Sequence, residues 1–149
     1  IGQNLGAKEY DRTKKGALFG TICGIGIAEV IGIAVFFFSP YLIAAFGGDQ
    51  KAIEYGIAEA HTIALFYCLL AFSHCMAAIQ RGAGRSIVPM FVMMLVWCGV
   101  RVTYISIVIR IIPVINVIYW AYPLTWFISS VIFLILFLKT DWIHGLEKQ

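Results

Sequence analysis

The stretch AIQRGAGRSIVP, residues 78–89, decides how this chain folds, because it places glycines and charges between two long apolar runs. Gly82 and Gly84 disfavour an unbroken helix through the stretch. Pro89 suits the first turn of a new helix, where its missing N–H costs nothing. The stretch therefore predicts a tight turn between two helices, which we call the joint.

Charges place the joint at one face of a membrane. Arg81 and Arg85 flank its glycines, as expected where a chain leaves lipid on the cytoplasmic side and re-enters at once. On the far side Lys51 is the one clear charge, with Arg110 at the edge. This bias predicts that both ends of the chain are cytoplasmic. The plasma (cell inner) membrane is the expected location. The predicted cytoplasmic cations are Lys8, Arg12, Lys14, Lys15, Arg81, Arg85, Lys139 and Lys148.

The composition is that of a membrane protein. Hydrophobic residues make up 61% of the 149 residues and charged residues 13%, and the mean hydropathy is +0.89. Soluble domains are about 45–50% apolar, and one bilayer crossing takes about 20 apolar residues. We therefore predict an all-α integral membrane fold with four transmembrane helices. They cover about 17–46, 57–79, 87–109 and 115–138, between a cytoplasmic lead-in over 1–15 and a cytoplasmic tail over 139–149.

The same pattern argues against several kinds of partner. The net charge of +3 is divided among the segments between apolar runs, so no nucleic-acid partner is predicted. The four cysteines lie inside the apolar runs without the spacing of metal ligands, so no metal or other cofactor is predicted. The lipid bilayer is the expected partner. Because the chain starts at Ile1, without Met or a cleavable signal, we expect it to be a fragment.

Small residues mark one face of the first predicted span. Gly16, Gly20, Gly24, Ala28 and Gly32 follow one another at every fourth position. Membrane helices with this spacing can approach each other closely. We therefore expect this face to pack against another helix.

The second span is predicted as one helix from about residue 50 to 80, longer than a bilayer needs. Asp49 ends a glycine turn and is predicted to cap this helix. Pro40, just before that turn, is expected to bend or end the first span.

Two opposite charges lie deep in the predicted membrane. Glu29 is about 21 Å from Lys15 along its helix, at about 1.5 Å per residue. Arg101 is about 24 Å from Arg85, which gives it nearly the same depth. A carboxylate in lipid must be paired, protonated or beside water, and it can also be purely structural. The shared depth leaves an ion pair with Arg101 and a wet cavity both open.

Two further polar side chains lie in the second span. Tyr67 is at about the depth of the two charges, and His74 is nearer the cytoplasmic side. A histidine in the membrane can relay protons, or it can simply form a hydrogen bond with a neighbouring helix. Both residues are candidates for the substrate or ion pathway.

The third span carries a stripe at helical spacing that includes Trp97, Arg101 and Tyr104. Such a stripe can be ordinary core, or it can form the wall of a cavity for bulky amphipathic ligands. The two thioethers that continue it are Met90 and Met94.

Aromatic residues crowd the outer half of the last span and are expected to form a belt at the membrane interface. They are Tyr119, Trp120, Tyr122 and Trp126.

Three motifs, taken together, resemble a known family. They are the opening IGQNLGA, residues 1–7, before a Lys/Arg-rich segment, the Arg81-Gly82-Ala83-Gly84 run with Pro89, and Trp97 followed by Arg101. With the order of the spans they resemble the multidrug and toxic compound extrusion (MATE) transporters over nearly the whole chain.

The resemblance implies a function. Family members are similar twelve-helix proteins of two lobes, so the four spans would be helices nine to twelve, beside a missing N-terminal lobe. It implies antiport, in which Na⁺ or H⁺ enters while small organic cations or drugs leave by alternating access. The chain departs from the family at residues 69–72, where several members carry a coupling carboxylate.

Two alternatives remain. One is a flippase of lipid-linked oligosaccharides from the same superfamily. A cavity that binds a pyrophosphate should be markedly cationic, and one buried arginine argues weakly against this alternative. The other is an intramembrane enzyme that uses His74, Cys75 or Glu29, but the chain lacks paired carboxylates or a nucleophile–base motif.

Overall fold

The structure, a computed structural model, describes residues 1–144, and Lys148 lies outside this range. Every regular element in residues 1–144 is helical, which confirms the all-α fold. The elements are α1 (Gly2–Gly6), α2 (Tyr10–Ala45), α3 (Gln50–Ala64), α4 (Tyr67–Gly82), α5 (Ile87–Met93), the π-helical segment η1 (Met94–Val100), α6 (Arg101–Ile111) and α7 (Asn116–Lys139).

Three helical stretches are long and apolar enough to cross a membrane: α2, the continuous stretch from α5 through η1 to α6, and α7. The pair α3 and α4 meets the same test, but the two helices are bent by 58° at a short break. Counted as one span, the bent pair brings the total to four.

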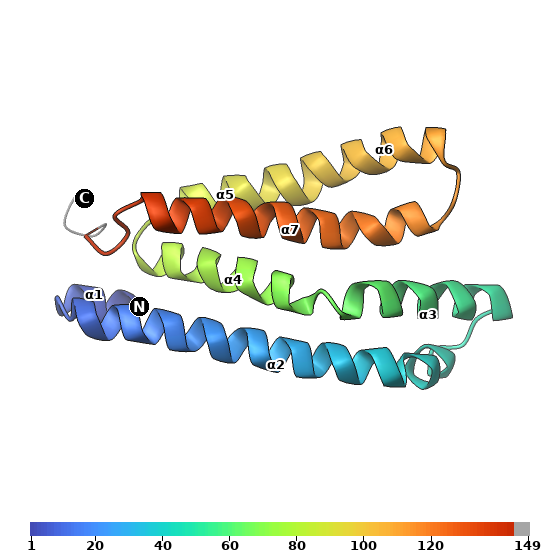
Figure 1. Ribbon diagram of the computed structural model, residues 1–149, viewed down its shortest axis with the longest axis horizontal. Helices are drawn as coiled ribbons and strands as arrows, with labels where there is room; N and C mark the ends of the chain where they lie inside the picture. Colours follow the sequence, from blue (N-terminus) through green and yellow to red (C-terminus); the bar gives the residue numbers. More distant parts are fainter. Residues whose placement is uncertain (145–149) are drawn as a thin grey trace.

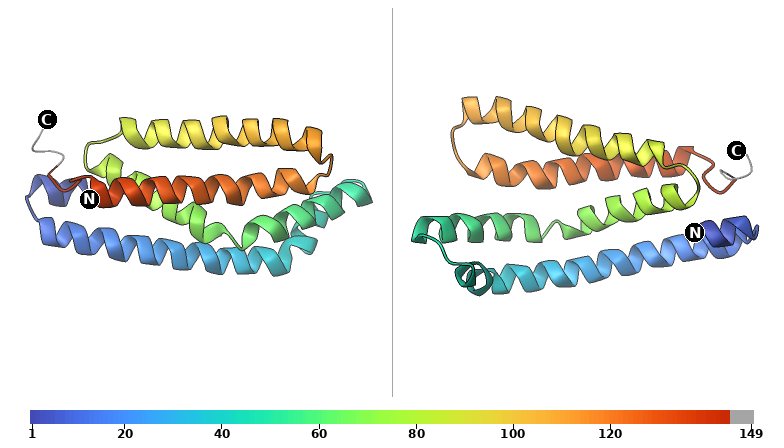
Figure 2. Two further views of the ribbon diagram at one scale, coloured as in Figure 1. Left: turned by 45° about the horizontal axis from the view of Figure 1, so that its top comes forward. Right: turned by 180° about the vertical axis from the view of Figure 1, so that it is seen from behind.

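The helices lie side by side in the order α2, then α3 with α4, then α7, then α5 with α6 (Figure 1). Figure 2 shows the same order from two other directions. In the middle, α4 packs against α2 on one face and against α7 on the other.

At the joint the chain makes a tight turn of the kind that ends many helices. Gly84 has a φ of +80°, which a residue without Cβ adopts at no cost. Its N–H donates to the Arg81 carbonyl at 3.0 Å, and the Arg85 N–H donates to the Gln80 carbonyl at 2.9 Å. Pro89 is buried in the first turn of α5. Backbone N–H groups in a first turn have no acceptor within the helix, so the missing N–H of proline breaks no hydrogen bond there.

Both ends of the described chain lie beside the joint. A Cβ on Gly82 would come within 2.9 Å of the Ile1 side chain, and the Arg85 guanidinium donates to the Asp141 carbonyl at 2.9 Å. We call this end of the bundle the joint end. The turns at residues 46–49 and 112–115 lie at the opposite end (Figure 1).

The predicted lead-in over residues 1–15 is divided between α1, a turn and the start of α2. Lys8 turns the chain with a φ of +59°, and α2 already begins at Tyr10. The buried Thr13 donates its hydroxyl to the Glu9 carbonyl at 2.8 Å, which ties the first turn of α2 together. Residues from Tyr10 onward therefore belong to the same continuous helix as the first predicted span.

The glycine face of α2 is tight over only half of its length. A Cβ on Gly24 would lie 3.0 Å from the Cys75 sulfur, and one on Gly32 would overlap the Ala64 carbonyl oxygen. At Gly16 and Gly20 a Cβ would meet nothing within 4 Å, so among residues 1–144 the expected close packing is absent at these two positions. Both glycines border a gap of about 420 Å³ between α2 and α4.

Two residues at or just before the glycine turn were predicted to shape the helices around it, Asp49 as a cap and Pro40 as a bend or an end. Asp49 caps α3, since its Oδ1 accepts from the Ala52 N–H at 2.6 Å. Pro40 was predicted to bend or end the first span; it does not end the helix, since α2 continues to Ala45, but the end of α2 bends away from the axis of the rest of the helix (Figure 1).

Candidate functional site

The second span contains a break in the middle of the bundle, which the sequence analysis did not predict. The chain leaves the helical path at Leu65 and Phe66, between α3 and α4. The N–H of Cys68, in the first turn of α4, donates to Oε2 of Glu29 at 3.2 Å. In an unbroken helix this N–H would donate to the Ala64 carbonyl, four residues earlier. The carboxylate of α2 therefore takes the place of a backbone acceptor.

Close approach of α2 explains the position of the break. Gly32 lies one turn beyond Glu29 and lets the backbone of α2 reach the Ala64 carbonyl, where a Cβ would overlap. The Tyr67 ring is also within 3.4 Å of that Cβ position. A glycine and a carboxylate three residues apart thus hold the end of α3 and the start of α4 together.

The carboxylate also suits its location electrostatically. The free N–H groups of a helix N-terminus carry partial positive charge, so an anion there is stabilised. A hydrogen bond to a charged acceptor is roughly twice as strong as a neutral one. Glu29 is half-buried, and α4 has no capping side chain of its own. Chemically, this is a carboxylate inside a membrane span that can hold a proton or a cation at a broken helix.

Arg101 lies on the other side of α4 and α7 and does not contact Glu29. Its Nη2 and Nε donate to Oγ1 of Thr125 at 2.7 and 3.3 Å. Its guanidinium lies over the Tyr122 ring, 4.3 Å from the centroid, and 5.8 Å from the centroid of Trp97. An ion pair between the two buried charges is therefore absent from the described residues, and each charge has its own partners.

A cluster of hydroxyls joins α4 to α7 next to this arginine. Ser73 is fully buried and lies 2.9 Å from the hydroxyls of both Ser129 and Ser130. Ser130 donates to the Leu69 carbonyl at 3.1 Å, and the Trp97 indole donates to Ser129 at 3.3 Å. Hydrogen bonds between side chains thus connect α4, α7 and η1.

The other predicted pathway residues have different surroundings. The Tyr67 ring packs against Trp126 with 6.1 Å between centroids, in the first turn of α4 beside Cys68. His74 is exposed and places its ring edge against Trp97 at 5.2 Å. Tyr104 has no hydrogen bond or ring contact in residues 1–144 and joins neither group.

The stripe predicted on the third span does not exist as one face. Trp97 and Arg101 face α7, whereas Met90 and Met94 are 55% and 50% exposed. The π-helical turn of η1 explains this, because it winds more residues per turn and shifts the faces before and after it. Val96 is buried instead.

The predicted aromatic belt on the last span is also wrong for most of its members. Trp126 and Tyr119 are buried, and Tyr122 stacks under Arg101, while Trp120 is exposed. Because α7 packs between α4 and the third span, most of these rings face the bundle. The polar partners that the sequence analysis missed are Thr125, Ser73 and the role of Tyr122. For Tyr122 and Thr125 the available signal was their spacing with Ser129 along α7, at intervals of three and four.

The comparison with known families agrees with this all-helical membrane architecture. Residues 1–107 match the MatE family. The chain belongs to the MatE family. This confirms the resemblance to MATE transporters that the motifs indicated, and it supports a multi-pass membrane transporter. The MatE superfamily includes both drug exporters and flippases. No curated protein and no solved structure matches the chain.

Proposed function

We propose that this MatE chain is part of an ion-coupled antiporter that exports small organic cations or drugs by alternating access, with Na⁺ or H⁺ as the coupling ion. The observation that carries the proposal is the Glu29 carboxylate bound to the Cys68 N–H at the break between α3 and α4. Secondary transporters use broken membrane helices of this kind to hold ions near the middle of the bilayer.

The coupling follows from the charge of Glu29. A proton or Na⁺ on the carboxylate neutralises it and weakens its hydrogen bond to Cys68, because that bond depends on the charged acceptor. The bend between α3 and α4 then loses a restraint. Ion binding and helix movement are thereby linked through one side chain.

The same geometry supports organic cations as the cargo. Glu29 brings negative charge to the α2 side of the bundle, where a cation is favoured. Arg101, which would repel a cation, is separated from Glu29 by α4 and α7 and is occupied by Thr125 and Tyr122. We propose that the chain works together with an N-terminal lobe of the same polypeptide, with its joint end in the cytoplasm.

A flippase receives less support. Binding a pyrophosphate needs free cationic donors, and the Arg101 fork already donates to Thr125 with two of its nitrogens.

An export assay tests the proposal. Cells that express the full-length protein should expel ethidium, and an ionophore that collapses the Na⁺ and H⁺ gradients should stop this export. Glu29→Gln should slow export by about tenfold or more, because a hydrogen bond to a charged group contributes about 1.5–3 kcal/mol. Glu54→Gln, at an exposed position on α3, is the control. Export that persists without either gradient, or that is unchanged in E29Q, would refute the antiporter.

A further inference from the structure

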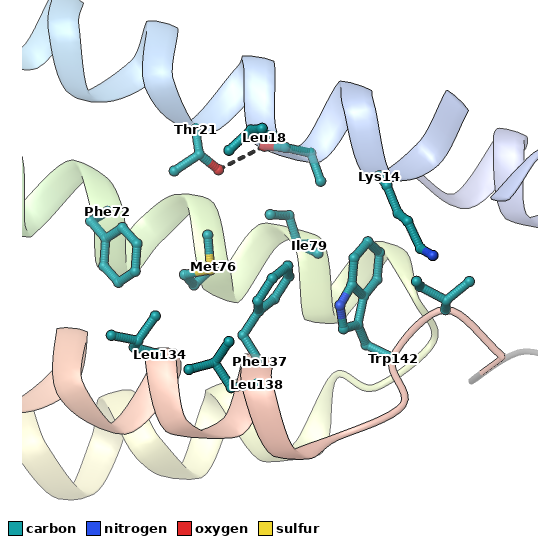
Figure 3. A pocket seen from close by; sticks show the side chains of 12 residues that line it. Lys14, Leu18, Thr21, Phe72, Met76, Ile79, Leu134, Phe137, Leu138 and Trp142 are labelled. Carbon is teal, nitrogen blue, oxygen red and sulfur yellow. Dashed lines mark hydrogen bonds between the residues drawn. The ribbon is translucent and has the colours of Figure 1, made fainter. Parts of the chain in front are cut away.

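A second feature of the joint end has no part in the proposed coupling. A cavity of about 450 Å³ lies between α2, α4 and α7 (Figure 3). Its lining is apolar apart from Lys14 and Thr21. Thr21 donates its hydroxyl to the Ala17 carbonyl at 2.8 Å, so its polar group is already satisfied. The lining includes Phe72, Met76, Leu134 and Phe137.

Lys14 is the charged group at this cavity. Figure 3 shows its side chain reaching from α2 toward Trp142, at the end of the cavity where α7 finishes. Lys14 is exposed, and in residues 1–144 it forms no ion pair. A cation therefore stands at the mouth of an apolar cavity, at the joint end of the bundle.

The cavity opens sideways. Leu18 and Leu138 line it and are 65% and 74% exposed, so its rim faces the surroundings of the bundle. From Lys14 to Thr21 the lining follows α2 for about 10 Å, at about 1.5 Å per residue. Its volume is in the range of sites for small organic ligands, about 300–1,000 Å³.

We propose that this cavity binds one anionic phospholipid, with an acyl chain between α2 and α7 and the headgroup phosphate on Lys14. The apolar lining accepts a hydrocarbon chain, and the Lys14 ammonium, which has no ion pair within residues 1–144, complements a phosphate. Basic pockets between membrane helices bind anionic headgroups in this way. A soluble phosphate would gain nothing from the lining, and an uncharged molecule would gain nothing from Lys14.

Native mass spectrometry of the full-length protein tests the proposal. The purified protein is equilibrated with phosphatidylglycerol or with phosphatidylcholine of the same acyl chains, and retained lipid is counted. We expect preferential retention of phosphatidylglycerol, reduced about fivefold by Lys14→Gln, since one such lysine contributes about 1 kcal/mol. Lys14→Arg should restore retention. Lys51→Gln, at the opposite end of the bundle, should leave it unchanged.

Two further arms test the position and source of the ligand. Leu18→Trp fills the open rim and should reduce phosphatidylglycerol retention, whereas soluble glycerol phosphate in excess should not compete. Equal retention of the two lipids, or full retention by K14Q or L18W, would overturn the proposal. Competition by glycerol phosphate would also overturn it, because the cavity would then be a simple anion site. If neither lipid is retained, the cavity is filled by another helix of the same polypeptide, which would overturn the proposal as well. Lipid retention is measured without an export assay. The lipid proposal can therefore be refuted while the proposed antiporter function stands.

Discussion

The two faces of α4 make different kinds of contact. Toward α7, Ser73 shares hydrogen bonds with two buried serines, and Ser130 returns one to the backbone of α4. Toward α2, the contacts include the close approach of Gly24 to Cys75 and the hydrogen bond from the Cys68 N–H to Glu29.

The difference separates a fixed contact from a releasable one. Neutral hydroxyls keep their hydrogen bonds whatever ion is present, so the α4–α7 contact stays intact through any change of charge. A carboxylate loses strength as an acceptor when it binds a proton or Na⁺. We infer that α4 moves with α7, and that the restraint on the bend toward α3 is the part that an ion can release.

The largest effect is expected at the fixed contact. Ser73→Leu removes the shared hydroxyl from a fully buried position and adds volume there. Overpacking costs about 1–3 kcal/mol, and each hydrogen bond in a membrane averages about 0.6 kcal/mol. We therefore expect the free energy of unfolding in mixed micelles to fall by about 3 kcal/mol.

Ser106→Leu is the matched control, because Ser106 is exposed on α6. Its free energy of unfolding should change by less than about 0.5 kcal/mol. Equal losses in S73L and S106L would show that the serine cluster does not hold α4 to α7.

A smaller effect is expected where α2 meets the break. Gly32→Ala places a methyl group onto the Ala64 carbonyl, so α2 and α3 must move apart, at a cost of about 2 kcal/mol in unfolding free energy. Gly26→Ala, where a Cβ would meet nothing within 4 Å, should be neutral in the same assay. A neutral G32A would mean that the close approach does not fix the break.

Much of the fold could be predicted from the sequence because bilayer thickness and turn chemistry are local constraints. The turn at Gly84 follows from the conformational freedom of glycine, and the cap at Asp49 follows from its side chain. The half-buried Glu29 and Arg101 could also be found, since charges stand out in apolar runs.

The partners of these charges could not be predicted, because they depend on how the helices pack. No proline or glycine marks the break at Leu65 and Phe66, which is fixed by Gly32 and Glu29 from another helix. The π-helical turn before Arg101 contains Gly99, but one glycine in a helix does not predict such a turn, which points Arg101 toward Thr125.

Electron paramagnetic resonance distances across the break test the central claim most directly. Spin labels at Ala58 on α3 and Ala78 on α4, both exposed, report the bend in a full-length protein whose four cysteines in this chain, and any others it has, are replaced. Glu29→Met removes the acceptor and should broaden and shift the distance distribution, while Glu29→Gln, which keeps an acceptor without its charge, should fall between E29M and the original protein. Indistinguishable distributions in all three proteins would contradict the claim that Glu29 holds the bend.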